Sequence, residues 1–103
     1  MGALPIEFHP EARLELIGAL EWYSERSHEA AQEFYQEVGR AQEAIQKDPN
    51  AWAVYLQGTR RYLLKRFKYV VIYRVFDDRI QFIALAHGNR KPGYWVNRLK
   101  SDT

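Results

Sequence analysis

Four residues in the second half of the chain could act on a phosphate group: Arg66, His87, Arg90 and Tyr94. Arginines bind phosphates or carboxylates through two hydrogen bonds at once. A histidine with an ordinary pKa near ~6.5 can move a proton, and a tyrosine can stack on a base. If they converge, these side chains could supply the base, the charge stabilisation and the leaving-group proton for phosphodiester cleavage by a neighbouring 2′-OH.

Each of these residues also has an ordinary structural interpretation. A histidine after a strand is more often a surface or hydrogen-bonded residue, and Tyr94-Trp95 would usually pack the C-terminal segment. Other chemistries lack a motif, because the chain has no cysteine, phosphate-binding glycine loop, serine elbow or metal-ligand spacing. The sequence therefore indicates no cofactor and no metal.

Two helices are predicted in the first half of the chain. A short strand over 4–8 precedes Pro10, which suits the first position of a helix reaching about Glu25. Ser27 is a good N-cap for a second helix, and Pro49 ends it shortly after Lys47. The solvated side of this second helix is predicted to carry Glu29, Glu33, Glu37 and Glu43. The short link between the helices implies an antiparallel hairpin.

Three strands are predicted in the second half, from aromatic and β-branched residues over Arg60–Phe67, Tyr69–Phe76 and Arg79–Ala86. The segment 51–58 is irregular, and a short tail turns helical from Tyr94. The order predicts one α+β domain over 1–103. An N-terminal strand and a helical hairpin are followed by a three-stranded antiparallel meander, with the helices on one sheet face.

The expected turns assign side chains to the two faces of this sheet. We take a tight hairpin at Asp77-Asp78 and a three-residue turn centred on Lys68. The face under the helices then holds Leu63, Phe67, Val71, Tyr73, Val75, Ile80, Phe82 and Ala84. The opposite face holds Arg60, Tyr62, Leu64, Arg66, Val70, Ile72, Arg74, Ile83, Leu85 and His87. An apolar face rimmed by arginines needs a cover, so we expect a partner surface there.

Charge is unevenly distributed along the chain. Residues 1–56 carry 4 Lys/Arg and 10 Asp/Glu, which gives a net charge of −6. Residues 57–103 carry 11 Lys/Arg and 3 Asp, which gives a net charge of +8. The basic half favours a polyanion or an acidic protein segment, although a basic sheet can also simply be solvated. The N-terminus lacks the apolar run of a signal peptide and no stretch reaches membrane-spanning length, so a cytoplasmic protein is expected.

Three segments together resemble the RelE/ParE toxin family, in its ParE-like, plasmid-stabilisation branch. They are 6–12 followed by 19–23, then Arg60–Val75, then Ile83–Trp95. This resemblance covers nearly the whole chain and implies a β-α-α-β-β-β fold. It also implies that the chain is the growth-inhibiting toxin of a bacterial type II toxin–antitoxin pair, with a cognate antitoxin as partner.

The resemblance leaves two mechanisms open. RelE-like members are ribosome-dependent, metal-independent messenger-RNA endoribonucleases, whereas ParE-like members are associated with poisoning DNA gyrase. Val70 replaces the RelE-like arginine after the tyrosine that opens a strand, and Lys65 and Arg66 match the strand lysines only in part. Arg90 and Tyr94 do resemble the nuclease-type pair. Because the segment from His87 to Trp95 is closer to ParE-like sequences, we predict gyrase inhibition, with the nuclease as the alternative.

The resemblance and the charge pattern together predict where the partner binds. An acidic amphipathic C-terminal segment of the antitoxin is expected across the basic, apolar-centred sheet surface. The residues predicted to bind the antitoxin or the cellular target are Arg60, Arg61, Lys65, Arg66, Arg74 and Trp95.

Overall fold

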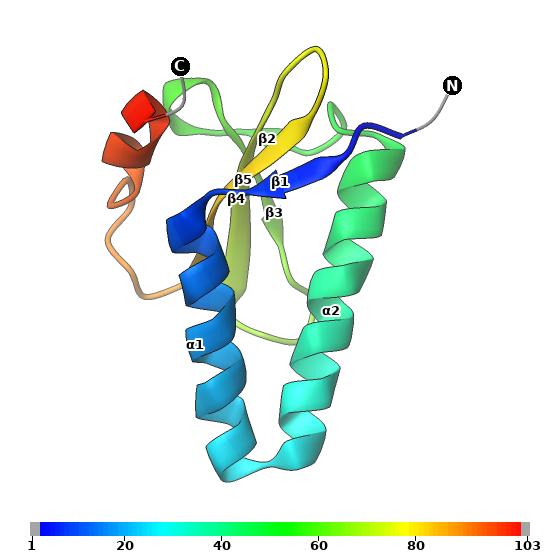
Figure 1. Ribbon diagram of the computed structural model, residues 1–103, viewed down its shortest axis with the longest axis vertical. Helices are drawn as coiled ribbons and strands as arrows, with labels where there is room; N and C mark the ends of the chain where they lie inside the picture. The colour runs from blue at the N-terminus through cyan, green and yellow to red at the C-terminus, as the bar shows by residue number, and fades with distance from the viewer. Residues whose placement is uncertain (1–2, 102–103) are drawn as a thin grey trace.

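Two antiparallel helices cover one face of a five-stranded mixed sheet in the computed structural model, which describes residues 3–101 (Figure 1). The elements in chain order are β1 (Ile6–Phe8), α1 (Pro10–Arg26), α2 (His28–Lys47), β2 (Ala53–Val54), the 3₁₀ turn η1 (Leu56–Gly58), β3 (Arg60–Leu63), β4 (Tyr69–Val75), β5 (Ile80–His87) and η2 (Val96–Ser101). The predicted α+β class, with a helical hairpin on one sheet face, is confirmed.

Local capping fixes both helices where the sequence predicts them. Pro10 occupies the first turn of α1, and the side chain of His9 accepts a hydrogen bond from the backbone N–H of Glu11. Ser27 ends α1 and also caps α2, because its Oγ accepts from the backbone N–H of Ala30 at 3.1 Å. One residue thus serves both helices, which explains the tight antiparallel turn. Neither helix is long and apolar enough to cross a membrane within residues 3–101.

The sheet has strand order β1-β5-β4-β3-β2, with β1 parallel to β5 and the other pairs antiparallel. The meander of β3, β4 and β5 was predicted. The two-residue edge strand β2 was not, because it falls in the segment expected to be irregular. The first of the three meander strands is shorter than predicted, since β3 ends at Leu63 and the chain continues as a connection over 64–68.

The predicted strand registers are partly wrong, and both errors move side chains across the sheet. Between β4 and β5, Val75 pairs with Ile80 as expected, but an irregularity between Ile72 and Tyr73 inserts one extra residue on β5. Leu85 therefore packs under the helices and Ala84 on the opposite face, the reverse of the prediction.

The second error concerns β3. The connection from β3 to β4 spans residues 64–68, which is longer than the predicted three-residue turn centred on Lys68. Tyr62 pairs with Val71 and Leu63 with Val70, an odd shift from the expected register, so every β3 side chain lies on the other face. Tyr62 and Leu64 are buried in the helix-side core, and Leu63 is 64% exposed. Arg60 pairs with Tyr73, which places Arg60 on the helix side as well.

A hydrophobic core lies on each side of the sheet. The helix-side core joins residues of both helices to three strands and includes Phe34, Val38, Ala41, Ile45, Val71, Tyr73, Ile80 and Phe82. The second core is smaller: Ile72, Ile83, Ala84 and Trp95 form it, with Val70, Tyr94, Val96 and Leu99 packed around them. The C-terminal segment thus covers part of the face that the sequence left without a cover.

The second core makes a prediction about stability. Trp95 is 2% exposed, so Trp95→Ala should lower the free energy of unfolding by about 3–5 kcal/mol through lost burial and a cavity. The matched control is Trp22→Ala, since Trp22 is 50% exposed; we expect a change under about 1 kcal/mol. Denaturant unfolding monitored by circular dichroism measures both. Equal losses in the two variants would mean that the C-terminal segment is not packed as described.

Candidate functional site

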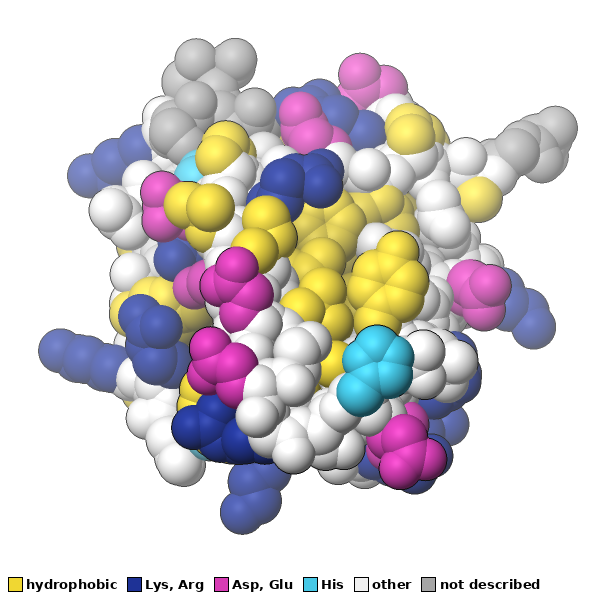
Figure 2. All heavy atoms as spheres, turned by 60° about the horizontal axis from the view of Figure 1, so that its bottom comes forward, with side chains coloured by type: hydrophobic (Ala, Val, Ile, Leu, Met, Phe, Trp, Pro, Cys, Tyr) yellow, Lys and Arg dark blue, Asp and Glu magenta, His cyan; other side chains and the backbone are white. Residues whose placement is uncertain are grey.

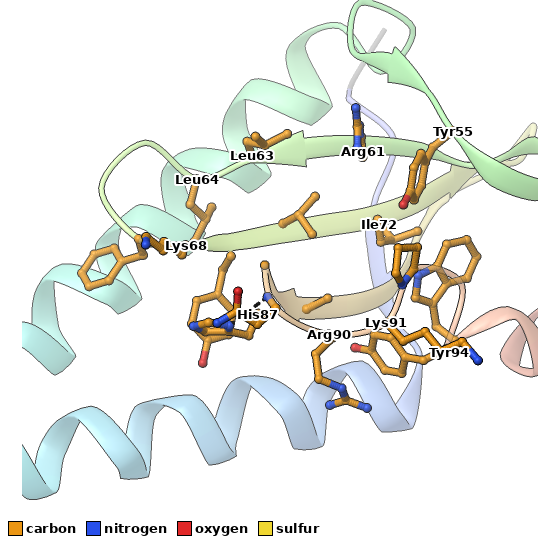
Figure 3. Close-up of a pocket in the computed structure, with 18 of the residues that line it drawn as sticks. Tyr55, Arg61, Leu63, Leu64, Lys68, Ile72, His87, Arg90, Lys91 and Tyr94 are labelled. Atoms are coloured by element: carbon orange, nitrogen blue, oxygen red, sulfur yellow. Dashed lines mark hydrogen bonds between the residues drawn. The ribbon is translucent and has the colours of Figure 1, made fainter.

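A cavity of about 660 Å³ lies between the connection that follows β3 and the segment that follows β5 (Figure 3). One wall comes from residues 61–70, the other from residues 86–95, and Tyr55 adds a ring at the edge. In Figure 3, Arg61 and Leu63 come from the β3 side, and His87, Arg90 and Tyr94 lie across the cavity from them. The cavity therefore gathers residues from the two segments in which the sequence placed its candidate chemistry.

The lining of this cavity is strongly basic. It includes six Lys or Arg residues and His87, and among the described residues around it none is Asp or Glu. The six are Arg61, Lys65, Arg66, Lys68, Arg90 and Lys91, all with exposed side chains. Like charges around one concave site raise the local potential and attract anions.

The helical side of the molecule has a hollow of different chemistry. It is lined by Leu20, Ser24, His28, Ala31, Gln32, Tyr35 and Gln36, with no Lys, Arg, Asp or Glu among these described residues. Figure 2 shows hydrophobic side chains gathered in this region between the two helices. The positive charge is therefore a property of the sheet-side cavity.

One wall of the basic cavity is positioned by Glu37 of α2. Its Oε1 accepts hydrogen bonds from the backbone N–H groups of Lys65 and Arg66, each at 3.1 Å. Its Oε2 accepts from Arg40 Nε at 3.0 Å, and the side chain is 5% exposed. Burial by itself would raise the pKa of Glu37, but the hydrogen bonds from Arg40 and the two backbone groups hold it below 4.5. The prediction that Glu37 belongs to a solvated helix side is wrong.

The other wall is anchored by Glu15 of α1. Its carboxylate accepts the Tyr94 hydroxyl at 2.6 Å, both terminal nitrogens of Arg98 at 2.9 and 3.0 Å, and the backbone N–H of Leu85 at 3.0 Å. Arg98 also donates to the carbonyl of Ile83 at 2.9 Å. Burial favours a raised pKa for Glu15, and the hydrogen bonds from Arg98, Tyr94 and Leu85 outweigh it. Burial, together with the hydrogen bond to Glu15, raises the pKa of Tyr94.

The four candidate catalytic residues all line the cavity, but each has a contact of its own. The His87 ring packs edge-on against Tyr69 with centroids 5.2 Å apart, and its Nδ1 accepts from the backbone N–H of Asn89. The Arg90 guanidinium lies 3.8 Å above the Tyr94 ring. Arg66 Nη2 lies 3.5 Å from a carboxylate oxygen of Glu33 on α2.

The residues predicted to bind a partner separate into two groups. Arg61, Lys65 and Arg66 line the cavity, and so does Trp95, although Trp95 is almost fully buried. Arg60 lies on the helix side, where its Nη1 donates to the carbonyl of Trp52 at 2.7 Å.

Arg74 also lies away from the cavity, with its Nε donating to Gln81 Oε1 at 3.0 Å and its Nη2 to the Leu99 carbonyl at 3.4 Å. Sequence reasoning missed Tyr55, Lys68 and Lys91 as lining residues, although Lys68 and Lys91 belong to the basic half that it noted.

Metal ligands do not gather in the described part of the chain. Within residues 3–101, no group of three or more His, Cys, Asp or Glu side chains is placed to hold a metal ion. The carboxylates of Glu15 and Glu37 each accept several hydrogen bonds from the protein, so they act as anchors.

Comparison with known proteins identifies the family and the fold. The family described as "ParE toxin of type II toxin-antitoxin system, parDE" matches residues 6–92. The chain belongs to the ParE toxin family. It is therefore the toxin component of a type II toxin–antitoxin system, as predicted, and such a toxin has an antitoxin as its partner. The match includes most of the cavity lining but ends before Tyr94 and Trp95.

Individual relatives agree with this ParE assignment. The chain is 27% identical over 88 residues to toxin ParE2 from two strains of Mycobacterium tuberculosis, covering 84% of each chain. A solved chain of the chromosomal ParDE toxin–antitoxin system from P. aeruginosa superposes with a TM-score of 0.71. That superposition covers 82% of this chain and 96% of the other, at 19% sequence identity, and so shows a shared fold.

The contact between Glu37 and the connection after β3 can be tested by truncation. Glu37→Ala should lower the free energy of unfolding by about 3 kcal/mol, because two backbone N–H groups lose their acceptor and Arg40 loses its partner. Glu33→Ala, one turn earlier on α2, removes a half-exposed ion pair and should cost under about 1 kcal/mol. Denaturant titration of both variants checks this; a Glu37 loss no larger than the Glu33 loss would contradict it.

The lowered pKa values of Glu15 and Glu37 predict a loss of stability in acid. A depressed folded-state pKa contributes stability that is present above the ordinary value of 4.5 and disappears as the pH falls through the folded-state pKa. Thermal unfolding between pH 6 and 3 should therefore show declining stability below about pH 5. Glu15→Gln should reduce the slope of the free energy of unfolding against pH, by up to the amount that uptake of about one proton produces. An unchanged slope in that variant would show that Glu15 does not contribute.

Proposed function

We propose that this ParE-type toxin arrests growth by inhibiting DNA gyrase through a binding surface centred on the basic cavity. We further propose that an acidic amphipathic segment of its antitoxin neutralises the toxin by covering the same surface. The family gives the toxin class, and the ParE-like resemblance points to gyrase as the target.

The observation that carries the proposal is the state of the Tyr94 hydroxyl. It donates to Glu15 at 2.6 Å, and its pKa is raised by burial and by that carboxylate. In this position the hydroxyl proton is already donated to Glu15, so it is not directed into the cavity to protonate a leaving oxygen. The cavity is better suited to binding than to cleavage.

An antitoxin segment suits the cavity both by charge and by burial. The rim carries six cationic side chains, which would pair with carboxylates of the segment. Leu63 is 64% exposed at the edge, and the apolar side chains of Val70 and Ile72 lie in the lining. Apolar side chains of an amphipathic segment would cover this surface.

A messenger-RNA endoribonuclease remains the second candidate, because one observation favours it. Arg66, His87, Arg90 and Tyr94 all line the same cavity. Rearrangement of the tyrosine on the ribosome would be needed for these four to act together.

Two measurements separate these functions. Purified toxin should block supercoiling of relaxed plasmid by DNA gyrase, and added antitoxin should restore it. Primer extension on a reporter messenger RNA should show intact message after brief induction of the toxin. His87→Ala, which removes a nuclease candidate, should leave gyrase inhibition within about threefold of the unmodified toxin, because most residues of a binding surface contribute little individually.

A messenger-RNA endoribonuclease would give the opposite results in both assays. Cuts within codons that disappear when translation is blocked, together with normal supercoiling, would refute the gyrase proposal. His87→Ala would then abolish cleavage.

A further inference from the structure

We propose that the basic cavity binds a single strand of DNA, with phosphates held by its cations and bases stacked on its tyrosine–arginine surfaces. This inference rests on the proposed function, since the proposed target, gyrase, acts on DNA. It adds a nucleic acid to a surface for which gyrase and an antitoxin segment were proposed above.

Most cations of the cavity are not neutralised by a neighbouring carboxylate. Within the part of the chain that the structure describes, Arg61, Lys65, Lys68, Arg90 and Lys91 have no carboxylate within ion-pair distance. The sixth cation of the lining, Arg66, lies 3.5 Å from Glu33. Four arginines outside the cavity pair with carboxylates: Arg26 with Glu25, Arg40 with Glu37, Arg79 with Glu7 and Asp78, and Arg98 with Glu15. A set of exposed cations without carboxylate partners is the electrostatic footprint of a site for a polyanion.

Two arginine–tyrosine pairs in the cavity favour a nucleic acid over an acidic peptide. The Arg90 guanidinium lies 3.8 Å over the Tyr94 ring, and the Arg61 guanidinium lies 4.7 Å over the Tyr55 ring. A guanidinium lying on a ring keeps its N–H edge for a phosphate and its outer face for a base. The two pairs lie on the lining of one cavity. Flat cationic surfaces of this kind suit unpaired bases, because every base has a face to stack.

Hydrogen bonds to glutamates hold both walls of the cavity in place. Glu15 fixes Tyr94 through its hydroxyl, which leaves the ring of Tyr94 as a support for Arg90. On the opposite wall, Glu37 fixes the backbone of Lys65 and Arg66. Both carboxylates bind the walls from outside the cavity and neither lines it. Pre-positioned groups lose less conformational entropy on binding.

The size of the cavity indicates a single strand. Its volume of about 660 Å³ falls in the range of sites that enclose small molecules, which is roughly 300–1,000 Å³. Such a space accommodates a few nucleotides of one strand with splayed bases, whereas a duplex keeps its bases stacked inside and could contact only the rim.

Fluorescence anisotropy tests the inference directly. Toxin separated from its antitoxin is titrated with a labelled DNA oligonucleotide of about twelve residues, its duplex, the RNA of the same sequence, and a version with abasic sites. We expect the DNA single strand to bind more tightly than the duplex, at least as tightly as RNA, and more tightly than the abasic strand.

Matched charge variants locate the site. Arg61→Gln with Arg90→Gln should weaken binding about tenfold or more and reduce the slope of log K against log salt by roughly 1.4, two phosphate contacts at about 0.7 each. Arg13→Gln with Lys47→Gln removes the same charge at two exposed positions away from the cavity, and should leave the affinity within about twofold. Equal losses in the two double variants would overturn the inference.

Three further outcomes would overturn it: no binding of the DNA strand at low salt, equal affinity for the abasic strand, or RNA bound at least about tenfold more tightly than DNA. The gyrase assay keeps the two proposals apart. Supercoiling inhibition without binding of the DNA strand rejects this inference and leaves the proposed function standing. Binding of the DNA strand in the cavity without supercoiling inhibition supports this inference and rejects the gyrase proposal.

Discussion

The partly buried carboxylate of Glu15 holds together three parts of this toxin that are far apart in the chain. It belongs to α1, accepts a backbone N–H of β5, and binds Tyr94 and Arg98 of the C-terminal segment. Removal of one partner of a fully buried ion pair destabilises a protein by about 3–5 kcal/mol, which is the upper bound for this partly buried pair. The second core and the stacked Arg90–Tyr94 pair both depend on this anchor, because it sets where the segment lies.

Glu37 plays the corresponding part on the opposite wall, where it holds the backbone of Lys65 and Arg66. Both anchors reach their walls from the helices, and each carboxylate is paired with an arginine outside the lining, Glu15 with Arg98 and Glu37 with Arg40. This separation reconciles a net charge of only +2 with a strongly basic site. It also suggests how neutralisation would work, since an acidic antitoxin segment and a DNA strand would compete for the same cations.

The sequence by itself determined the local structure and the family. Pro10 and Ser27 mark the helix starts because capping depends on neighbouring residues only. Aromatic and β-branched runs marked the meander strands, and the excess of Lys and Arg after residue 57 marked the basic half. Of the cavity's cations, Arg61, Lys65, Arg66 and Arg90 were all named from sequence.

Only the tertiary structure decided the register and the roles of individual side chains. An extra residue on β5 and a longer connection after β3 moved Leu85 and Tyr62 under the helices, and the alternation of the strands alone could not reveal either change. Glu37 binds the backbone of Lys65, which is 28 residues further along the chain. Glu15 binds Leu85, Tyr94 and Arg98, at sequence separations of 70, 79 and 83 residues. In the sequence, both resemble the other glutamates of amphipathic helices, because burial and hydrogen bonding at such separations exist only once the chain has folded.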